Sequence, residues 1–279
     1  MRMIYKLYFL TLFVAMLFSG CTNAPTHKVD NSLAINHLQS EIGDNKKTFI
    51  IETSPYLLFG LKDSNMECKN RIMHLYIEGD GMGWRSPTEL SNDPTPDNPI
   101  GAKLFDADNY NCKIYLARPC QYVKNSACNQ DVWSDKRFSS TVISSYNQAL
   151  DRLKQKYGNN GFVLVGYSGG GAIVTLLSAQ RSDIDTIVTV AGNLDTRAWT
   201  SYHHITPLYG SLNPADIARE ISNIKQFHLI GSSDDIMPIN VVNSYKSKSN
   251  SDNIHIINYP NFKHNSNWED IFKNFIKGI

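Results

Sequence analysis

Residues 162–170 read FVLVGYSGG, so that an apolar run leads directly to a serine between glycines. The run 162–165 shows no alternation of apolar and polar residues, which is typical of a strand buried on both faces. Gly166, Ser168 and Gly170 then form a G-x-S-x-G pattern. In a tight strand-to-helix turn, the residues two before and two after the serine must be small, so that the hydroxyl can project from the sheet. The stretch predicts such a turn, with Ser168 as nucleophile; the alternative is a glycine-rich turn with an idle serine.

Strand-like and helix-like segments alternate along the rest of the chain. We expect strands at 47–53, 56–61, 72–77, 113–117, 162–165, 185–190, 226–230 and 254–259, and helices at 99–106, 138–157, 172–179, from 213 onward, 239–245 and 268–276, with loops at 84–98 and 118–137. Strands joined by crossover helices form parallel sheets. The sequence therefore predicts an α/β fold with a mostly parallel central sheet, an antiparallel N-terminal hairpin and helices on both faces. Ligands of such sheets bind at the carboxyl ends of the strands.

A serine needs a base, and the base needs an acid that orients it. Two loops that follow later strands offer these groups. Asp234 follows the strand at 226–230, with Asp235 as a reserve candidate, and His264 follows the strand at 254–259. Because the order serine, acid, histidine suits this fold, we expect Ser168, Asp234 and His264 to form the catalytic group.

Acyl transfer also needs N–H donors for the developing oxyanion. We expect one to be the backbone N–H of Gly169, directly after the nucleophile. The second should come from the glycine-rich loop after the strand at 72–77, and we assign it to the N–H of Asp80 ahead of that of Gly81. The alternative is that this loop is a plain glycine-rich turn.

Further residues are candidates for the substrate pocket. The irregular insert at 192–212 is expected to form a pocket wall or a small cap. The candidate pocket residues are Glu78, Gly81, Tyr167, Trp199 and His203.

These motifs together resemble the α/β-hydrolase superfamily in order and spacing, over roughly residues 47–277. The stretches YIEGDGMGW, YLARPCQYV, LVGYSGGGA and VTVAGNLDTRAWT are also similar to a group of uncharacterised bacterial α/β-hydrolase lipoproteins. The resemblance implies the fold and a hydrolytic reaction. Many esterases of the superfamily carry His-Gly where this chain has Glu78-Gly79. From Glu78 and Asp80 we expect a cleft that disfavours anionic acyl groups, through Coulomb repulsion.

The N-terminus has the pattern of an export signal. Arg2 and Lys6 precede a short apolar core, and the sequence FSGC ends at Cys21. This pattern is typical of a bacterial lipoprotein signal, with an ordinary cleaved signal peptide as the alternative. We expect residues 1–20 to be a signal peptide, a lipidated Cys21 to anchor the chain in the membrane, and residues 21–46 to be a polar tether with at most one short helical turn. Residues 47–279 would then be the hydrolase domain, at the periplasmic face of the outer membrane.

The cysteines agree with export. Apart from Cys21, four remain, an even number that permits two disulfides in an oxidising compartment. Cys120 and Cys128 are the favoured pair because they are close in a loop-like stretch, and Cys68–Cys112 would follow. The alternative is four buried free thiols.

The composition argues against nucleic acid as a partner. Among 279 residues, 27 Lys and Arg against 26 Asp and Glu give a net charge of +1. Such a balance lacks the basic excess of nucleic-acid-binding proteins. The sequence contains no phosphate-binding or dinucleotide-binding glycine motif and no zinc-type cysteine spacing, so we expect neither a cofactor nor a metal.

The sequence therefore favours a serine hydrolase that cleaves small-molecule carboxylic esters in the bacterial envelope. A peptidase, an amidase or an acyltransferase could use the same triad, because pocket shape selects the leaving group. The alternative of another class is an envelope lipoprotein that keeps the fold without activity. Oligomeric state is not predicted.

Overall fold

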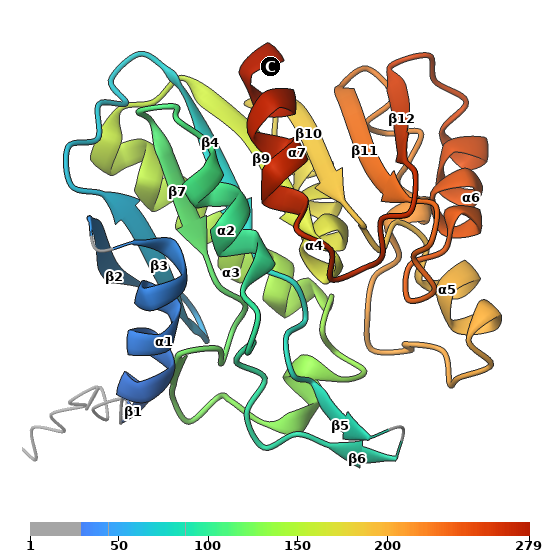
Figure 1. The fold of residues 1–279 in the computed structure, drawn as a ribbon, viewed down its shortest axis with the longest axis horizontal. Coiled ribbons are helices and arrows are strands. Elements are labelled where there is room, and N and C mark those ends of the chain that lie inside the picture. The colour runs from blue at the N-terminus through green and yellow to red at the C-terminus, as the bar shows by residue number, and fades with distance from the viewer. Residues whose placement is uncertain (1–28, 44, 87) are drawn as a thin grey trace, which may run out of the picture.

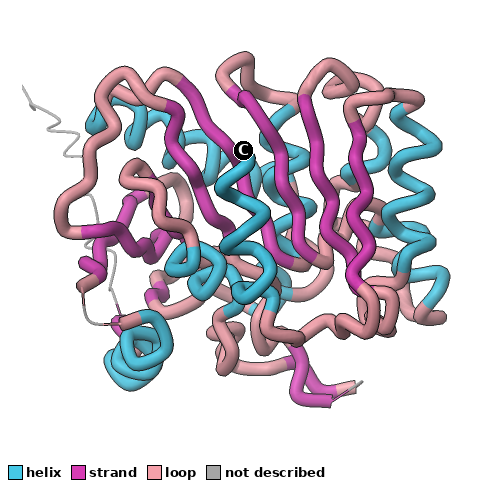
Figure 2. The backbone as a smooth tube through the Cα atoms, turned by 45° about the horizontal axis from the view of Figure 1, so that its top comes forward, coloured by secondary structure: helices cyan, strands magenta, loops and turns pink. Residues whose placement is uncertain are grey.

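The computed structural model describes residues 29–43, 45–86 and 88–279, so the expected leader and Cys21 lie outside the described residues. Its centre is a sheet of eight strands in the order β12-β11-β10-β9-β4-β7-β3-β2 (Figures 1 and 2). The strands are β2 (Lys46–Glu52), β3 (Leu57–Asp63), β4 (Ile72–Ile77), β7 (Lys113–Leu116), β9 (Gly161–Tyr167), β10 (Ile184–Val190), β11 (Lys225–Gly231) and β12 (Ile254–Tyr259).

The pairing in the sheet is antiparallel at one edge and parallel elsewhere. β2 pairs with β3, and β3 with β7, in antiparallel register. β7, β4, β9, β10, β11 and β12 are parallel neighbours. The predicted fold class, a mostly parallel sheet with an antiparallel N-terminal hairpin, is confirmed.

Helices pack on both faces because the side chains of a strand alternate between them. Leu75 and Ile77 of β4 join one core cluster, together with residues of α3 (Ser140–Tyr157) and α4 (Gly169–Ser178). Tyr76 faces the other way, into a cluster with α2 (Ile100–Ala107) and α7 (Trp268–Phe275). α6 (Ile239–Ser249) packs beside β11. The rigid sheet therefore holds the loops at its carboxyl end in fixed positions.

The segment before β2 differs from the expected tether. β1 (Val29–Asp30) pairs with β8 (Val123–Lys124), and α1 (Ser32–Ile42) is a helix of eleven residues rather than a short turn. The Asn31 side chain caps α1 by accepting the N–H of Ala34. Leu38 and Ile42 are buried. The apolar positions 35, 38 and 42 of a mostly polar sequence are enough to dock the helix on the domain.

Three loop regions contain short elements that were not predicted. Residues 84–98 include a hairpin of β5 (Trp84–Ser86) and β6 (Glu89–Leu90), and residues 118–137 include the 3-10 helix η1 (Gln130–Trp133). The insert contains α5 (Thr196–Tyr202), which Asp195 caps. A short 3-10 helix, η3 (Ile276–Gly278), follows α7.

The prediction of a helix from residue 213 onward is wrong in the length of the helical segment. Only a 3-10 turn, η2 (Pro214–Asp216), forms there. The Asn213 side chain does not cap it, because its Oδ1 accepts the N–H of Thr196 instead. Asn213 therefore closes the insert at 192–212 instead of capping a helix.

Both expected disulfides form, Cys68–Cys112 and Cys120–Cys128. Disulfides persist in oxidising compartments such as the periplasm and the cell exterior. Within the described ranges, none of the helices has the length and apolar character that crossing a membrane requires.

Candidate active site

Ser168 lies in the sharp turn between β9 and α4, as the sequence predicts. Its backbone has φ 49° and ψ −117°, a conformation that is costly for a residue with a side chain. The turn closes only around glycines. A Cβ on Gly166 would lie 2.3 Å from the carbonyl oxygen of Gly170, and one on Gly170 would lie 2.3 Å from that of Ile77. The neighbouring strand is held as well, since the N–H of Ser168 donates to the carbonyl of Val190.

The structure brings Ser168, His264 and Asp234 together from three loops at the carboxyl end of the sheet. His264 Nε2 is 3.0 Å from Ser168 Oγ, and His264 Nδ1 is 2.9 Å from Asp234 Oδ2. The second oxygen, Asp234 Oδ1, accepts the N–H groups of Ile236 and Met237. Asp234 is buried, whereas the reserve candidate Asp235 is exposed. The arrangement allows His264 to take the proton of Ser168 while the Asp234 carboxylate orients the ring.

Tyr167 has a positioning role that sequence reasoning missed. Its hydroxyl donates to the backbone carbonyl of His264 and to Asn265 Oδ1, at 3.1 Å each, and its ring packs 5.3 Å from the His264 ring. Burial raises the pKa of the Tyr167 hydroxyl, so it stays protonated and donates. The side chain next to Ser168 therefore holds the loop that carries His264.

The loop after β4 lies against the nucleophile. A Cβ on Gly79 would come within 3.4 Å of the Ser168 Cβ, and one on Gly169 would come within 2.0 Å of Asp80 Oδ1. Among the described residues, the backbone N–H of Asp80 has no acceptor. The N–H of Gly169 directly follows Ser168 at the start of α4, and the loop that carries the N–H of Asp80 packs against Ser168 and Gly169. Gly81, the other candidate donor, has φ +63° and packs against Pro94.

The carboxylate of Asp80 is clamped between two guanidinium groups. Arg118 Nη1 donates to Oδ1 at 2.6 Å, and Arg137 Nη1 donates to Oδ2 at 2.9 Å. Burial acts to raise the pKa of Asp80, but the two arginines outweigh it, and the pKa lies below its usual value. Both arginines are buried. The clamp fixes the backbone of Asp80 and leaves a local charge of +1.

Glu78 occupies a different environment. Its carboxylate is buried and accepts the N–H groups of Gly79, Gly101 and Ala102 and the hydroxyl of Tyr115. Gly101 and Ala102 are in the first turn of α2, so Glu78 serves as its cap. Burial outweighs these hydrogen bonds and raises the pKa of Glu78. The expected repulsion of anionic acyl groups by Glu78 and Asp80 loses its basis, because one carboxyl is enclosed and the other is neutralised.

A disulfide-closed turn supports the same loop. Gln121 Nε2 donates to the carbonyls of Gly79 and Pro94, and Gln121 Oε1 accepts the N–H of Arg118. Cys120, between these two residues, is bonded to Cys128. Gln121 lies inside the ring that this disulfide closes, and Arg118 lies two residues before the ring.

The site opens into a cleft of about 810 Å³. Of the pocket candidates, Glu78, Gly81, Tyr167 and Trp199 line it. His203 does not: its Nε2 lies 2.9 Å from the carbonyl oxygen of Ile236, and its neighbour His204 lines the cleft instead. Asn193 and Ile205 also line it, so the insert at 192–212 forms a wall of the cleft, as expected. Sequence reasoning missed four further lining residues: Met82, Trp84, Arg137 and Ile236. Their segments have no common motif, and only proximity to the glycine-rich loop could have indicated the first two.

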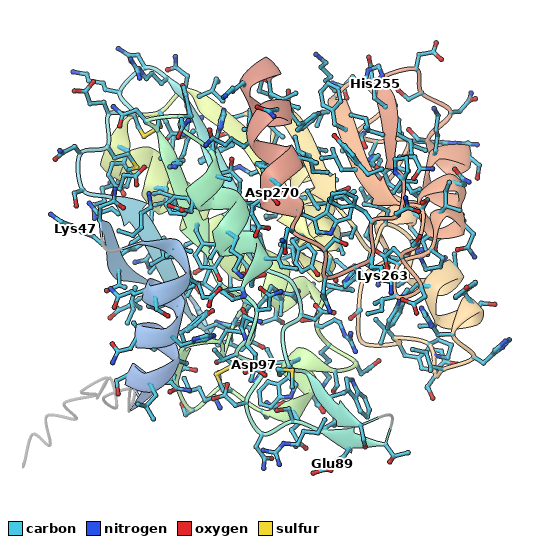
Figure 3. The ribbon with its side chains drawn as sticks, in the orientation of Figure 1. Lys47, Glu89, Asp97, His255, Lys263 and Asp270 are labelled. Atoms are coloured by element: carbon cyan, nitrogen blue, oxygen red, sulfur yellow. A yellow bond between two sulfur atoms is a disulfide. The ribbon has the colours of Figure 1, made fainter. Side chains whose placement is uncertain are left out.

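Figure 3 labels Lys263, which is next to His264 in sequence, and Asp97, which lines the cleft and lies below and to the left of Lys263 in this view. In the part of the chain that the structure describes, no group of three or more His, Cys, Asp or Glu side chains could hold a metal ion.

Comparison with solved structures identifies the architecture. An α/β serine hydrolase homologue from Coxiella burnetii matches with a TM-score of 0.60 at 11% identity, over 84% of this chain and 97% of that chain. An esterase from Pyrococcus furiosus matches with a TM-score of 0.60 at 12% identity, over 86% and 92%. The esterase domain of a Rhodothermus marinus protein gives 0.57 at 12%, over 84% and 97%. No protein-family model and no curated protein matches the sequence. The chain has the α/β-hydrolase fold.

Proposed function

We propose that the chain is a serine hydrolase that cleaves carboxylic esters through an acyl-enzyme on Ser168. The observation that carries this proposal is the continuous hydrogen-bonded line from Ser168 Oγ through His264 to the buried Asp234. The strained elbow and the unpaired N–H of Asp80 support it. Two of the compared structures are named as esterases, which favours esters as the substrate class.

Each group has one role in the proposed reaction. His264 Nε2 takes the proton of Ser168 as Oγ bonds to the carbonyl carbon of the ester. The N–H groups of Gly169 and Asp80 hold the oxyanion of the tetrahedral intermediate. The ester C–O bond then breaks, and His264 gives its proton to the departing alcohol. Water, activated by the same histidine, hydrolyses the acyl-enzyme and releases the acid.

We also propose that the enzyme acts in the bacterial envelope, anchored by a lipid on Cys21. The support comes from the FSGC sequence at residues 18–21 and from the two disulfides. Lipidation would hold the domain at a membrane surface without a spanning helix.

Steady-state assays of the mature chain test the reaction class. With p-nitrophenyl butyrate, Ser168→Ala should lose about 10⁴-fold or more in kcat, as removal of a triad serine does. Ser40→Ala, which changes an exposed serine on α1, is the matched control and should retain full activity. Faster turnover of aminoacyl anilides than of esters would make the protein a peptidase or amidase. A folded chain that hydrolyses neither substrate would contradict the proposal.

A further inference from the structure

Exposed apolar side chains gather at the mouth of the cleft. Ten large apolar side chains are exposed among the described residues, and four of them line the cleft. Two more, Tyr209 and Ile239, follow closely on lining residues in sequence. We call these six residues the apolar rim: Met82, Trp84, Ile205, Tyr209, Ile236 and Ile239, which are between 39% and 81% exposed. Exposed apolar side chains that gather at a cleft mouth, rather than being scattered singly, are typical of a contact surface.

The described chain begins beside this mouth. Asn31 Nδ2 donates to Asp93 Oδ2, and His37 Nε2 lies 2.9 Å from the carbonyl of Asp97, a cleft-lining residue. Figure 1 shows β1, the β5–β6 hairpin and α5 at the lower end of the molecule, whereas the C-terminus lies at the upper end. In Figure 3, Glu89 of this hairpin is labelled at the lowest point. The start of the domain and the cleft mouth therefore share one end.

The link to the expected anchor is short. Eight residue steps separate Cys21 from Val29, which span about 28 Å at full extension. A domain of this length is roughly 45 Å across by its expected radius of gyration. A chain anchored at Cys21 can therefore bring its lower end to the bilayer, but it cannot turn its upper end there without lifting β1 out of reach.

We propose that the apolar rim docks on the bilayer that holds the anchor, and that the substrates are acyl esters residing in that bilayer. An acyl chain would pass from the membrane along the rim to Ser168 without crossing water. Trp84 suits such a position, because its ring is apolar and its N–H can face the headgroups. The substrate class rests on the proposed esterase function, and the orientation rests on lipidation of Cys21.

Fluorescence of the mature lipidated chain in vesicles tests the docking without any catalysis. The vesicles contain phosphatidylethanolamine and phosphatidylglycerol, with or without bromine on the acyl chains. Bromine quenches only nearby tryptophans, so emission should fall by roughly a quarter if one of the four tryptophans, Trp84, reaches the acyl chains. In Trp84→Phe this loss should disappear. An unquenched wild-type chain, or a chain recovered without lipid, would overturn the proposal.

Turnover in the same vesicles tests the substrate class. The probes are 4-methylumbelliferyl oleate, which partitions into the bilayer, and the water-soluble acetate with the same leaving group. Tyr209→Ser combined with Ile239→Ser should lower the ratio of oleate to acetate turnover about tenfold, because docking is weakened. Ile279→Ser, at the opposite end of the molecule, is the matched control and should leave the ratio unchanged. An unchanged ratio in the double variant would contradict the inference. If the wild-type chain hydrolysed neither ester, the esterase function would be refuted, and the quenching result would still decide whether the rim docks on the bilayer.

Discussion

The loop after β4 and the segment that contains α5 both line the cleft, but polar contacts hold the first and apolar side chains make up much of the second. Glu78, Asp80 and Gln121 tie the β4 loop to α2, to two arginines and to a disulfide-closed turn. By contrast, Trp199 and His203 of the α5 segment both bond the same carbonyl, that of Ile236. Ile205, Leu208 and Ile236 add apolar surface to that wall, beside His204 and Thr206.

This difference follows from what each wall meets. In the proposed reaction, charge would develop near the β4 loop, where N–H donors must be held in place beforehand, because preorganised dipoles cost no rearrangement at the transition state. The α5 wall would meet the acyl or alcohol group of the substrate, where non-directional apolar contact is sufficient. We call the loop after β4 the polar wall and the segment that contains α5 the apolar wall. Substitutions on the polar wall should therefore change kcat, and substitutions on the apolar wall should change KM.

The largest effect should come from a substitution in the proposed triad of Ser168, His264 and Asp234. The smaller effects expected for the two walls are compared with it. Asp234→Asn should lower kcat by about 10⁴-fold, because an amide stabilises the wrong tautomer of His264. Ester turnover under saturating substrate measures this effect, and thermal unfolding verifies the fold. Asp235→Asn is the matched control, since Asp235 is exposed and close in sequence. Equal losses in the two variants would refute the assignment of Asp234.

Loss of the Asp80 clamp should break the polar wall. Asp80→Asn keeps the backbone N–H but leaves Arg118 and Arg137 without their carboxylate, so we expect kcat to fall by about 10²-fold with little change in KM. A rise in KM with constant kcat would place Asp80 in substrate binding instead.

The same variant should alter the acid stability of the protein. Because the folded-state pKa of Asp80 lies below its unfolded value of about 3.9, the clamp stabilises the fold above that pH. This contribution is lost as the pH falls through the folded pKa. Denaturant unfolding between pH 2 and 5 should therefore depend less on pH in Asp80→Asn than in the wild type.

The two disulfides should have different roles. Cys120–Cys128 should support the polar wall, and Cys68–Cys112 should stabilise the domain as a whole. Cys120→Ser with Cys128→Ser loosens the turn that carries Arg118 and Gln121, and should lower kcat about tenfold. Cys68→Ser with Cys112→Ser opens a larger loop and should cost roughly 2–4 kcal/mol of unfolding free energy. The folded fraction of this second variant should keep its kcat. If both pairs affect kcat alike, the turn has no special role.

The smallest effect should come from the apolar wall. Ile205→Ser removes an exposed apolar side chain that lines the cleft, and should raise KM for a butyrate ester by about threefold with kcat nearly constant. Michaelis–Menten curves give both parameters. A loss confined to kcat would show that the two walls do not divide the work as described.

The sequence predicted the residues that converge through topology. Ser168, Asp234 and His264 were identified because each follows a strand, and parallel strands end at one edge of the sheet. The elbow glycines were identified because the turn demands small residues at fixed spacing. These inferences need only local pattern and strand order, which is why they could be made from one sequence.

The surroundings of the site could not be predicted in the same way. Arg137 reaches Asp80 across 57 residues, and Glu78 caps a helix more than twenty residues further along. Neither contact has a local signal, so both carboxyls were expected to face the cleft as free charges. The α1 helix was missed because its few buried apolar residues are spread through a polar segment.

Covalent labelling shows whether Ser168 is an activated nucleophile. The mature wild-type chain and its Ser168→Ala variant are incubated with a fluorophosphonate, and the modified peptide is identified by mass spectrometry. An activated serine should give one covalent adduct per chain, located on Ser168 and absent from the variant. Equal labelling of the folded wild type and variant, or no labelling of either, would contradict the assignment of Ser168 as the nucleophile.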